Sequence, residues 1–365
     1  MLHGPDSFQT AIPLQVELNT IAASFGCLSS KITTMHKHLQ HLTHDTTDLP
    51  DNGAAIGIAK ALARALEEYH TQRNEQHQHS INTPLTPAVV LMVVQPGETN
   101  SCDQRDLEFL LQQSFSVRLI RRTLLDLEAA TYQGAFDQRE LILQGDDGND
   151  VAAGVVYYRA GYTPNDYPTE LEWAGRAKAE HSAAIKCPDV FYHLVGAKKV
   201  QQALAEPGAL GPFCSSKEEE TLLSSCFARL YALGEGDDSQ TVEMALANPH
   251  GYVLKPQREG GGNNLYDEEL VTHLKNMTYA ERGAYILMEK ILPPSAQGSL
   301  VRGGEIVYHG DCVCELGVFG ISLREYGGPT LMDEVVGHIL RAKSVTTDEG
   351  GVAAGYAFLS SPTLV

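Results

Sequence analysis

Several signatures of common functional classes are missing from this 365-residue sequence. It has no apolar run approaching the roughly 18–20 residues of a membrane span, so we predict no contact with the membrane interior. Positive charge is scarce, because 27 lysines and arginines stand against 46 aspartates and glutamates, giving a formal net charge of −19. This balance argues against nucleic acid or an anionic membrane as a general partner. Anionic ligands must therefore be bound by cations concentrated at one place.

Paired metal-binding or redox cysteines are also missing. The seven cysteines include no Cys-x-x-Cys pair, which disfavours both a zinc site and a thioredoxin-type redox site. Reduced thiols in a cytoplasmic protein are the simplest account of them. His38, His41 and His44 align roughly at helical spacing, but no acidic or thiol partner in the same register completes a metal site.

The most informative stretch runs from Lys255 to Asn264, directly after an apolar run. In an extended segment Lys255, Gln257 and Glu259 would project to the same side. Three following glycines let the backbone approach a ligand and turn its N–H groups toward an anion. A lysine, a carboxylate and a bare backbone suit a nucleoside triphosphate with Mg²⁺. The alternative is a polar turn after a strand, and no Gly-Lys-Ser/Thr follows to make a Walker loop.

A second polar pattern lies near the N-terminus. Residues 14–19 alternate strictly between apolar and polar, which predicts a half-buried strand. Glu17 and Asn19 would lie on its polar face, two residues apart, and their oxygens are suitable Mg²⁺ ligands. The same alternation is expected of any half-buried strand, so this pattern alone does not decide between a Mg²⁺ site and an ordinary strand.

A third cluster lies near the C-terminus. Arg341 and Lys343 are two residues apart, and a run of small residues follows at 350–355. Arginine binds carboxylates through two nitrogens, whereas lysine acts as a point charge. The alternative is a solvated strand face, but the small residues favour close approach of a ligand.

The length of the chain favours two domains. Residues 70–87 lack apolar periodicity and are predicted to form a linker. Beyond them, short apolar strands alternate with helices, which indicates a parallel sheet with helices on its faces. The predicted strands are 88–94, 117–120, 141–143 and 155–158, and the predicted helices are 103–113 and 171–185. Strands of another sheet are predicted at 252–259, 285–290, 312–319 and 331–337.

Five segments, in order along the chain, resemble motifs of eukaryotic-type glutathione synthetases. They are residues 15–26, 255–266, 288–291, 315–320 and 350–355. The resemblance implies a mixed α/β (α+β) protein with an ATP-grasp fold and an inserted smaller α/β parallel-sheet substrate domain. The implied domains are 1–87, the first part of the ATP-grasp region, 88–190, the inserted domain, and 191–365, the rest of the ATP-grasp region.

The family's activity is the ligation of glycine to γ-glutamylcysteine through an acyl phosphate, with ATP and Mg²⁺, in a cytoplasmic homodimer. By motif, the resemblance implies Mg²⁺ ligands at Glu17, Asn19 and Glu259. It implies nucleotide contacts at Lys198, Lys255, Gly260, Gly261, Gly262, Asn264, Tyr266, Met288, Glu289, Glu315 and Lys343. It implies dipeptide contacts at Ala22, Ala23, Ser24, Asn100, Gln104, Arg159, Tyr162, Arg341, Val352 and Ala353. Catalysis would be carried by Lys198, Lys255, Glu259 and Arg341.

Two departures from the family pattern qualify these expectations. Ala22 stands where the family usually has a serine, so a contact there would use the backbone. Only fourteen residues precede Gln15, where the family has a long segment with a substrate-binding arginine. We therefore expect a fragment or a truncated relative that binds ATP·Mg²⁺ but ligates poorly. The alternatives are another ATP-grasp amino-acid ligase and a non-catalytic nucleotide-binding relative.

Overall fold

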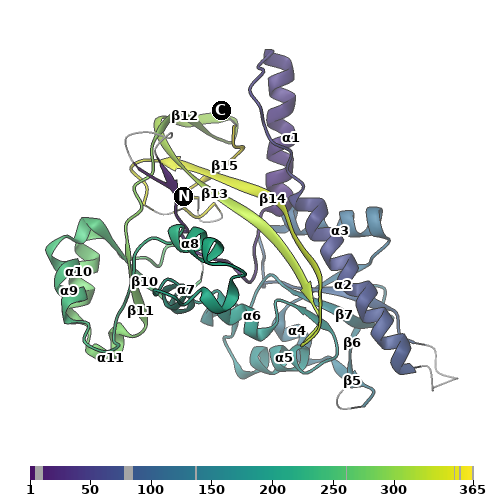
Figure 1. Cartoon of the computed structure of the whole chain (residues 1–365). Coiled ribbons are helices and arrows are strands. Elements are labelled where there is room, and N and C mark those ends of the chain that lie inside the picture. Colours follow the sequence, from purple (N-terminus) through teal and green to yellow (C-terminus); the bar gives the residue numbers. More distant parts are fainter. Residues whose placement is uncertain are drawn as a thin grey trace. The chain divides into compact units, whose positions relative to one another are not determined.

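The computed structural model describes residues 1–4, 11–77, 85–135, 138–259, 261–348, 350–352 and 355–363 (Figure 1). Contacts divide the chain into two compact units. The first unit comprises Met1–Thr20, Tyr192–Leu316 and Arg341–Phe358. The second comprises Ile21–Phe191, Gly317–Leu340 and Leu359–Val365. Each unit therefore combines segments that are far apart in the sequence.

The second unit contains a six-stranded sheet with strand order β4-β3-β7-β6-β5, and β8 also pairs with β7. Its strands are β3 (Ala88–Val93), β4 (Leu119–Arg122), β5 (Thr131–Gln133), β6 (Glu140–Gln144), β7 (Asp150–Tyr158) and β8 (Ile185–Cys187). Strand β3 is parallel to β4 and β7, and β7 is parallel to β8. Strands β5 and β6 are antiparallel to their neighbours. The four strands predicted in this region are confirmed, and the parallel sheet carries an antiparallel edge.

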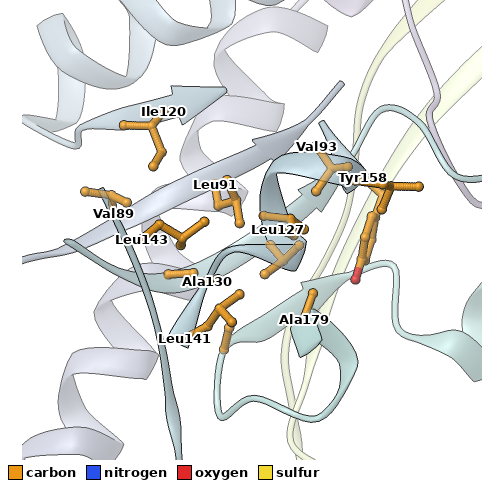
Figure 2. Packing of buried hydrophobic residues seen from close by; sticks show 14 of the residues in the cluster. Val89, Leu91, Val93, Ile120, Leu127, Ala130, Leu141, Leu143, Tyr158 and Ala179 are labelled. Carbon is orange, nitrogen blue, oxygen red and sulfur yellow. The ribbon is translucent and has the colours of Figure 1, made fainter. Parts of the chain in front are cut away.

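Strand β3 is buried on both faces, as its continuous apolar run predicts. Figure 2 shows Val89, Leu91 and Val93 in one hydrophobic cluster with Tyr158. Val90 and Met92 face the opposite cluster. The first face is covered by α4 (Leu124–Glu128) and α5 (Glu170–Glu180), and the second by α1 (Gly26–Thr43), α2 (Ala54–His77) and α3 (Ser101–Phe115).

Two predictions in this unit are wrong. The predicted linker begins inside α2, because residues 70–77 are helical, and residues 78–84 lie outside the described ranges. Arg73 anchors this part of the helix by donating to both carboxylate oxygens of buried Glu140. The helix predicted over 171–185 ends at Glu180. Beyond it, the N–H of Ala183 donates to the carbonyl of Arg139, and the chain joins the sheet as β8 from Ile185.

The first unit contains a three-stranded antiparallel sheet, with β11 between β10 and β9. These strands are β9 (Leu230–Ala232), β10 (Tyr252–Pro256) and β11 (Tyr285–Glu289). Leu254 and Leu287 pack against Leu270 and Leu274 of α10 and Ala245 of α9. The helices of this part of the chain are α6 (Val190–Val195), α7 (Lys198–Leu204), α8 (Lys217–Ser225), α9 (Ser239–Ala247), α10 (Asp267–Asn276) and α11 (Tyr279–Arg282).

A four-stranded sheet has the order β12-β13-β14-β15. Its strands are β12 (Ala296–Arg302), β13 (Glu305–Arg324), β14 (Thr330–Ser344) and β15 (Phe358–Ser360). The strands predicted at 312–319 and 331–337 lie inside β13 and β14, which are much longer. The boundary between the two units falls within both of these strands.

The strand predicted at residues 14–19 is not formed. Gln15 makes only an isolated bridge to Phe227, and Leu18 of the expected apolar face is exposed. The strands nearby are the short pair β1 (Leu2–His3) and β2 (Ile12–Pro13). Within the described ranges, no helix has the length and apolarity needed to cross a membrane.

Candidate functional site

Lys198 and Glu259 form an ion pair in the first unit. Lys198 is the first residue of α7, and its Nζ lies 3.3 Å from Oε1 of Glu259, which follows β10. The same Nζ donates to the carbonyl of Arg258 at 2.7 Å. The backbone N–H of Lys199 donates to Oε1 of Gln257 at 3.0 Å. These three contacts fix the start of α7 against the segment that precedes the glycines.

Glu17 lies in the same cluster, among cations. Lys255 donates to the carbonyl of Val16 at 2.9 Å, which ties β10 to the segment that carries Glu17. Burial by itself would raise the pKa of Glu17, but Lys255, Lys198, a hydrogen bond from Asn19 and Arg341 together hold it below its usual value. Glu17 is therefore ionised near neutral pH.

The two carboxylates of the cluster repel one another. Burial raises the pKa of Glu259, and the nearby Glu17 adds to this rise against the opposing effect of Lys198 and Lys255. A divalent cation near both carboxylates would relieve the repulsion. Asn19 donates from Nδ2 to Oε1 of Glu17 at 3.2 Å, which places its amide beside one of these carboxylates.

These residues fit a Mg²⁺ ion that arrives with other ligands. Among the residues that the structure describes, no three His, Cys, Asp or Glu side chains come together as a metal site. Two carboxylates and one amide oxygen are an incomplete set for Mg²⁺, which usually takes its remaining ligands from water and substrate phosphates.

Glu315 on β13 faces both cations predicted on β14. Its carboxylate lies 3.9 Å from NH1 of Arg341 and 3.8 Å from Nζ of Lys343. Lys343 also donates to the carbonyl of Asp348 at 2.6 Å. A Cβ added to Gly350 would lie 2.8 Å from Oε2 of Glu315, so a larger residue there would displace the Glu315 carboxylate. The predicted cations and the start of the small-residue run therefore come together.

Met288 and Glu289, which are predicted to contact the nucleotide, lie in β11 of the three-stranded sheet. Met288 is buried in β11, and its side chain packs in the core. A ligand there would meet its main chain or the neighbouring Glu289, whose carboxylate lies 3.9 Å from Nε of Arg229. Lys290 is not among the predicted site residues. Its Nζ nevertheless lies 5.4 Å from the ring centroid of Tyr266 and 3.0 Å from Oδ1 of Asp348.

The remaining residues of the nucleotide set lie around the glycine run. Asn264 donates to the hydroxyl of Tyr266 at 3.4 Å. Gly262 has a φ of +84°, and a Cβ added there would meet nothing within 4 Å. Gly261 and Val352 are described, whereas Gly260 and Ala353 lie outside the described residues. The structure therefore gathers most of the predicted nucleotide and metal residues, with Arg341, in the first unit.

A second cluster lies in the second unit, where β3 and β7 end. Open α/β sheets bind ligands at the carboxyl ends of their strands. Arg159 directly follows β7, and its NH2 donates to Oδ2 of Asp103 at 3.2 Å. Asp103 lies in the first turn of α3 and also accepts the N–H groups of Phe25, Cys27 and Leu28 at 3.0–3.1 Å. Asp103 thus joins Arg159 to the turn that follows Ala22.

The other predicted dipeptide residues in this unit are held by acidic neighbours. Glu98 accepts the N–H of Asn100 at 2.6 Å and the side-chain amide of Gln104 at 2.8 Å. Asp166 accepts the N–H of Tyr162 at 3.1 Å. Ala22 has a φ of 53°, and the carbonyl of Ala23 accepts a hydrogen bond from Tyr157 at 3.4 Å. Ser24 lies half-buried in the same turn.

Asp103, Glu98 and Asp166 were missed by the sequence analysis. A signal was present for Glu98, which lies four residues after the strand predicted at 88–94, and for Asp103, which is the first residue of the helix predicted at 103–113. These carboxylates hold predicted ligand-binding groups in place and follow no ligand-binding motif of their own.

Comparisons with known proteins identify the family of this chain. The family model described as "Eukaryotic glutathione synthase, ATP binding domain" matches residues 1–364. A chloroplastic glutathione synthetase of Arabidopsis thaliana is 40% identical over 96% of the chain, which spans 62% of that protein. Glutathione synthetases of Homo sapiens and Dictyostelium discoideum are 40% and 38% identical over 95% and 96% of the chain, which spans 70% and 72% of them.

The fold also matches a solved structure. A glutathione synthetase-like effector from Globodera pallida has a TM-score of 0.72 and 21% identity, covering 100% of this chain and 74% of that one. The predicted mixed α/β class and ATP-grasp fold are confirmed at this level.

Proposed function

We propose that this chain, which belongs to the eukaryotic glutathione synthase family, ligates glycine to γ-glutamylcysteine at the expense of ATP. The chain spans about 62% of the first relatives it matches, so this is the activity we assign to the protein that carries it. The observation that carries the proposal is the cluster of Glu17, Glu259, Lys198 and Lys255 in one unit. It combines cations for phosphates with carboxylates for a hard cation.

The reaction has two steps. The γ-phosphate of ATP passes to the cysteinyl carboxylate of γ-glutamylcysteine, which gives ADP and an acyl phosphate. The amine of glycine then attacks the acyl carbon, loses a proton and expels phosphate as glutathione forms. Phosphoryl transfer of this kind depends on placement and charge neutralisation more than on a protein nucleophile. A site built from lysines, carboxylates and glycines meets that need.

Each residue of the cluster has a distinct role in this proposal. Lys198 and Lys255 bind phosphate oxygens, and the contacts of Gln257 and Arg258 hold Lys198 in position. Glu17, Asn19 and Glu259 hold Mg²⁺, which supplies charge neutralisation of the phosphates when it is bound. Gly261 and Gly262 allow the backbone to lie close to the phosphates.

Each unit contains candidate dipeptide-binding residues of its own. In the second unit, Arg159 and the turn at Ala22–Ser24 offer a guanidinium and backbone groups. In the first unit, Arg341 offers a guanidinium whose ion-pair distance to Glu315 is long, at 3.9 Å. An arginine with a weak partner can donate to a substrate carboxylate from two nitrogens.

We further propose a homodimer in the cytoplasm, from the family resemblance and from the cysteines. All seven cysteines are free thiols in the structure. Light scattering of the purified protein tests the first proposal. Cell fractionation tests the second.

The acceptor specificity and the catalytic competence are tested together. ADP release and product formation are measured with γ-glutamylcysteine and ATP·Mg²⁺, using glycine, β-alanine or serine as acceptor. The proposal expects glycine to give the highest kcat/KM and one glutathione per ADP. Preference for another acceptor would identify a different amino-acid ligase of the same fold. Nucleotide binding without any ligation would identify a non-catalytic relative.

A further inference from the structure

The ammonium group of Lys198 lies where it neutralises a predicted metal ligand. Its Nζ is 3.3 Å from Oε1 of Glu259, and the lysine side chain is only 6% exposed. The carbonyl of Arg258 accepts from the same Nζ at 2.7 Å, so the ammonium is held from two sides. A lysine fixed in this way lies beside the carboxylate oxygen that a metal would need.

The charge of the cluster without a ligand is positive. Lys198, Lys255 and Arg341 all act on Glu17, and Lys198 and Lys255 also act on Glu259. Among these described residues, three cations against two carboxylates leave one net positive charge. Glu315 and Lys343, 3.8 Å apart, add one charge of each sign and do not change this balance. Such a cluster attracts a polyphosphate anion and repels a free divalent cation.

We infer that Lys198 excludes free divalent metal from Glu259 and admits it only together with a nucleotide. The inference rests on the proposed function, because it assigns the order in which that site fills. A polyphosphate brings its own negative charge, which draws the ammonium of Lys198 away from Glu259. The carboxylate is then available to the metal that the nucleotide carries. Lys198 therefore acts as an internal counter-ion before the nucleotide binds and as a phosphate ligand afterwards.

This role predicts effects of opposite sign for two ligands. Removing the charge of Lys198 frees Glu259 and brings the cluster to neutrality, so the site should gain affinity for free metal. The same change removes a phosphate ligand, so affinity for the metal–nucleotide complex should fall. A lysine that served only to hold the fold, or only to bind phosphate, would not produce the first effect.

The test measures the binding of Mn²⁺ to the full-length protein in the absence of nucleotide. The electron paramagnetic resonance signal of the free ion shows how much Mn²⁺ remains unbound. Lys198→Met should bind Mn²⁺ at least about tenfold more tightly than the parent protein, since one unit charge a few ångströms away can contribute more than that factor. Calorimetry should show that the same variant binds Mn²⁺·ATP more weakly. The double variant Lys198→Met, Glu259→Gln should lose the gained Mn²⁺ site.

Two further variants serve as controls. Lys198→Arg keeps the positive charge and should exclude Mn²⁺ as the parent does. Lys199→Met removes the neighbouring lysine, which pairs with Glu235 at 3.2 Å, and should also behave as the parent. If Lys198→Met does not fold, Lys198→Gln replaces it with a polar side chain of similar length.

Two results would overturn the inference. One is that the parent protein binds free Mn²⁺ as tightly as Lys198→Met does. The other is that neither Lys198→Met nor Lys198→Gln binds free Mn²⁺ more tightly than the parent protein. If the parent binds Mn²⁺·ATP normally in those cases, only the role of Lys198 is wrong. If the parent binds no Mn²⁺·ATP at all, the proposed function fails with it.

Discussion

Arg159 and Asp103 form a buried ion pair at the carboxyl end of the parallel sheet, with NH2 of the arginine 3.2 Å from Oδ2 of the aspartate. Their side chains are 4% and 3% exposed. Because Asp103 also accepts three backbone N–H groups, the pair joins the end of β7 to the start of α1. A dipeptide that contacts Arg159 would therefore bind a guanidinium that the fold has already oriented.

Asp103→Ala should strongly destabilise the protein. The substitution leaves the guanidinium of Arg159 buried without its carboxylate and removes the acceptor of three N–H groups. Breaking a buried pair in this way costs about 3–5 kcal/mol of unfolding free energy. Urea denaturation measures the change. The control is Asp147→Ala, which removes the exposed partner of Arg118 and should leave the urea midpoint unchanged. Equal midpoints for the two variants would contradict the role of Asp103.

Glu259→Gln should abolish Mg²⁺-dependent ATP turnover and leave the fold intact. Mg²⁺ requires near-ideal oxygen geometry, so the loss of one of two carboxylates severely weakens the site. ADP release and thermal unfolding are measured side by side. Glu235→Gln is the matched control, because that glutamate is exposed and pairs with Lys199 outside the cluster. Turnover of Glu259→Gln close to that of the control would show that Glu259 is not a metal ligand.

Gly262→Ala should raise the KM for ATP. Gly208 provides a close control, because its φ is +82° against +84° for Gly262 and an added Cβ meets nothing within 4 Å at either position. Both alanines should cost roughly 1–2 kcal/mol of stability through the left-handed backbone. Only the substitution at Gly262 should affect ATP, since its loop is assigned to the phosphates. An equal KM in the two variants would make the glycine run structural.

Arg341→Lys should impair use of γ-glutamylcysteine more than use of ATP. Lysine keeps the charge facing Glu315 but loses the two-nitrogen contact with a carboxylate. Each substrate is titrated separately at a saturating concentration of the others. A rise in KM for ATP alone would instead assign Arg341 to the nucleotide.

The sequence predicts well those elements that are buried through apolar side chains. The run at 88–93 is buried on both faces, and its strand and parallel neighbours follow from composition alone. Residues 70–77 are helical although their sequence lacks apolar periodicity. Arg73 anchors this part of the helix through a buried ion pair with Glu140, and such a pair produces no apolar periodicity from which a helix could be predicted. Residues 14–19 alternate between apolar and polar as a strand does. In the structure this segment belongs to a charged cluster instead, because Lys255 donates to the carbonyl of Val16 and Glu17 lies among cations.

In the candidate site, too, some features could be predicted from the sequence and others could not. Residue patterns singled out Lys255, Glu259 and Arg341, and motif resemblance added Lys198. The structure brings all four near Glu17. The contacts that orient these groups could not be predicted, because they join residues far apart in sequence. Lys198 meets Arg258, and Arg159 meets Asp103, only after the fold has formed.

The most direct test of the account is the stoichiometry of ADP and glutathione in a single reaction of the full-length protein. γ-Glutamylcysteine, glycine and ATP·Mg²⁺ are supplied together, and both products are quantified over time. The account predicts one glutathione per ADP, no turnover without glycine or dipeptide beyond a slow background, and loss of both products in Glu259→Gln. ADP release that does not depend on either substrate, or that yields no glutathione, would contradict it.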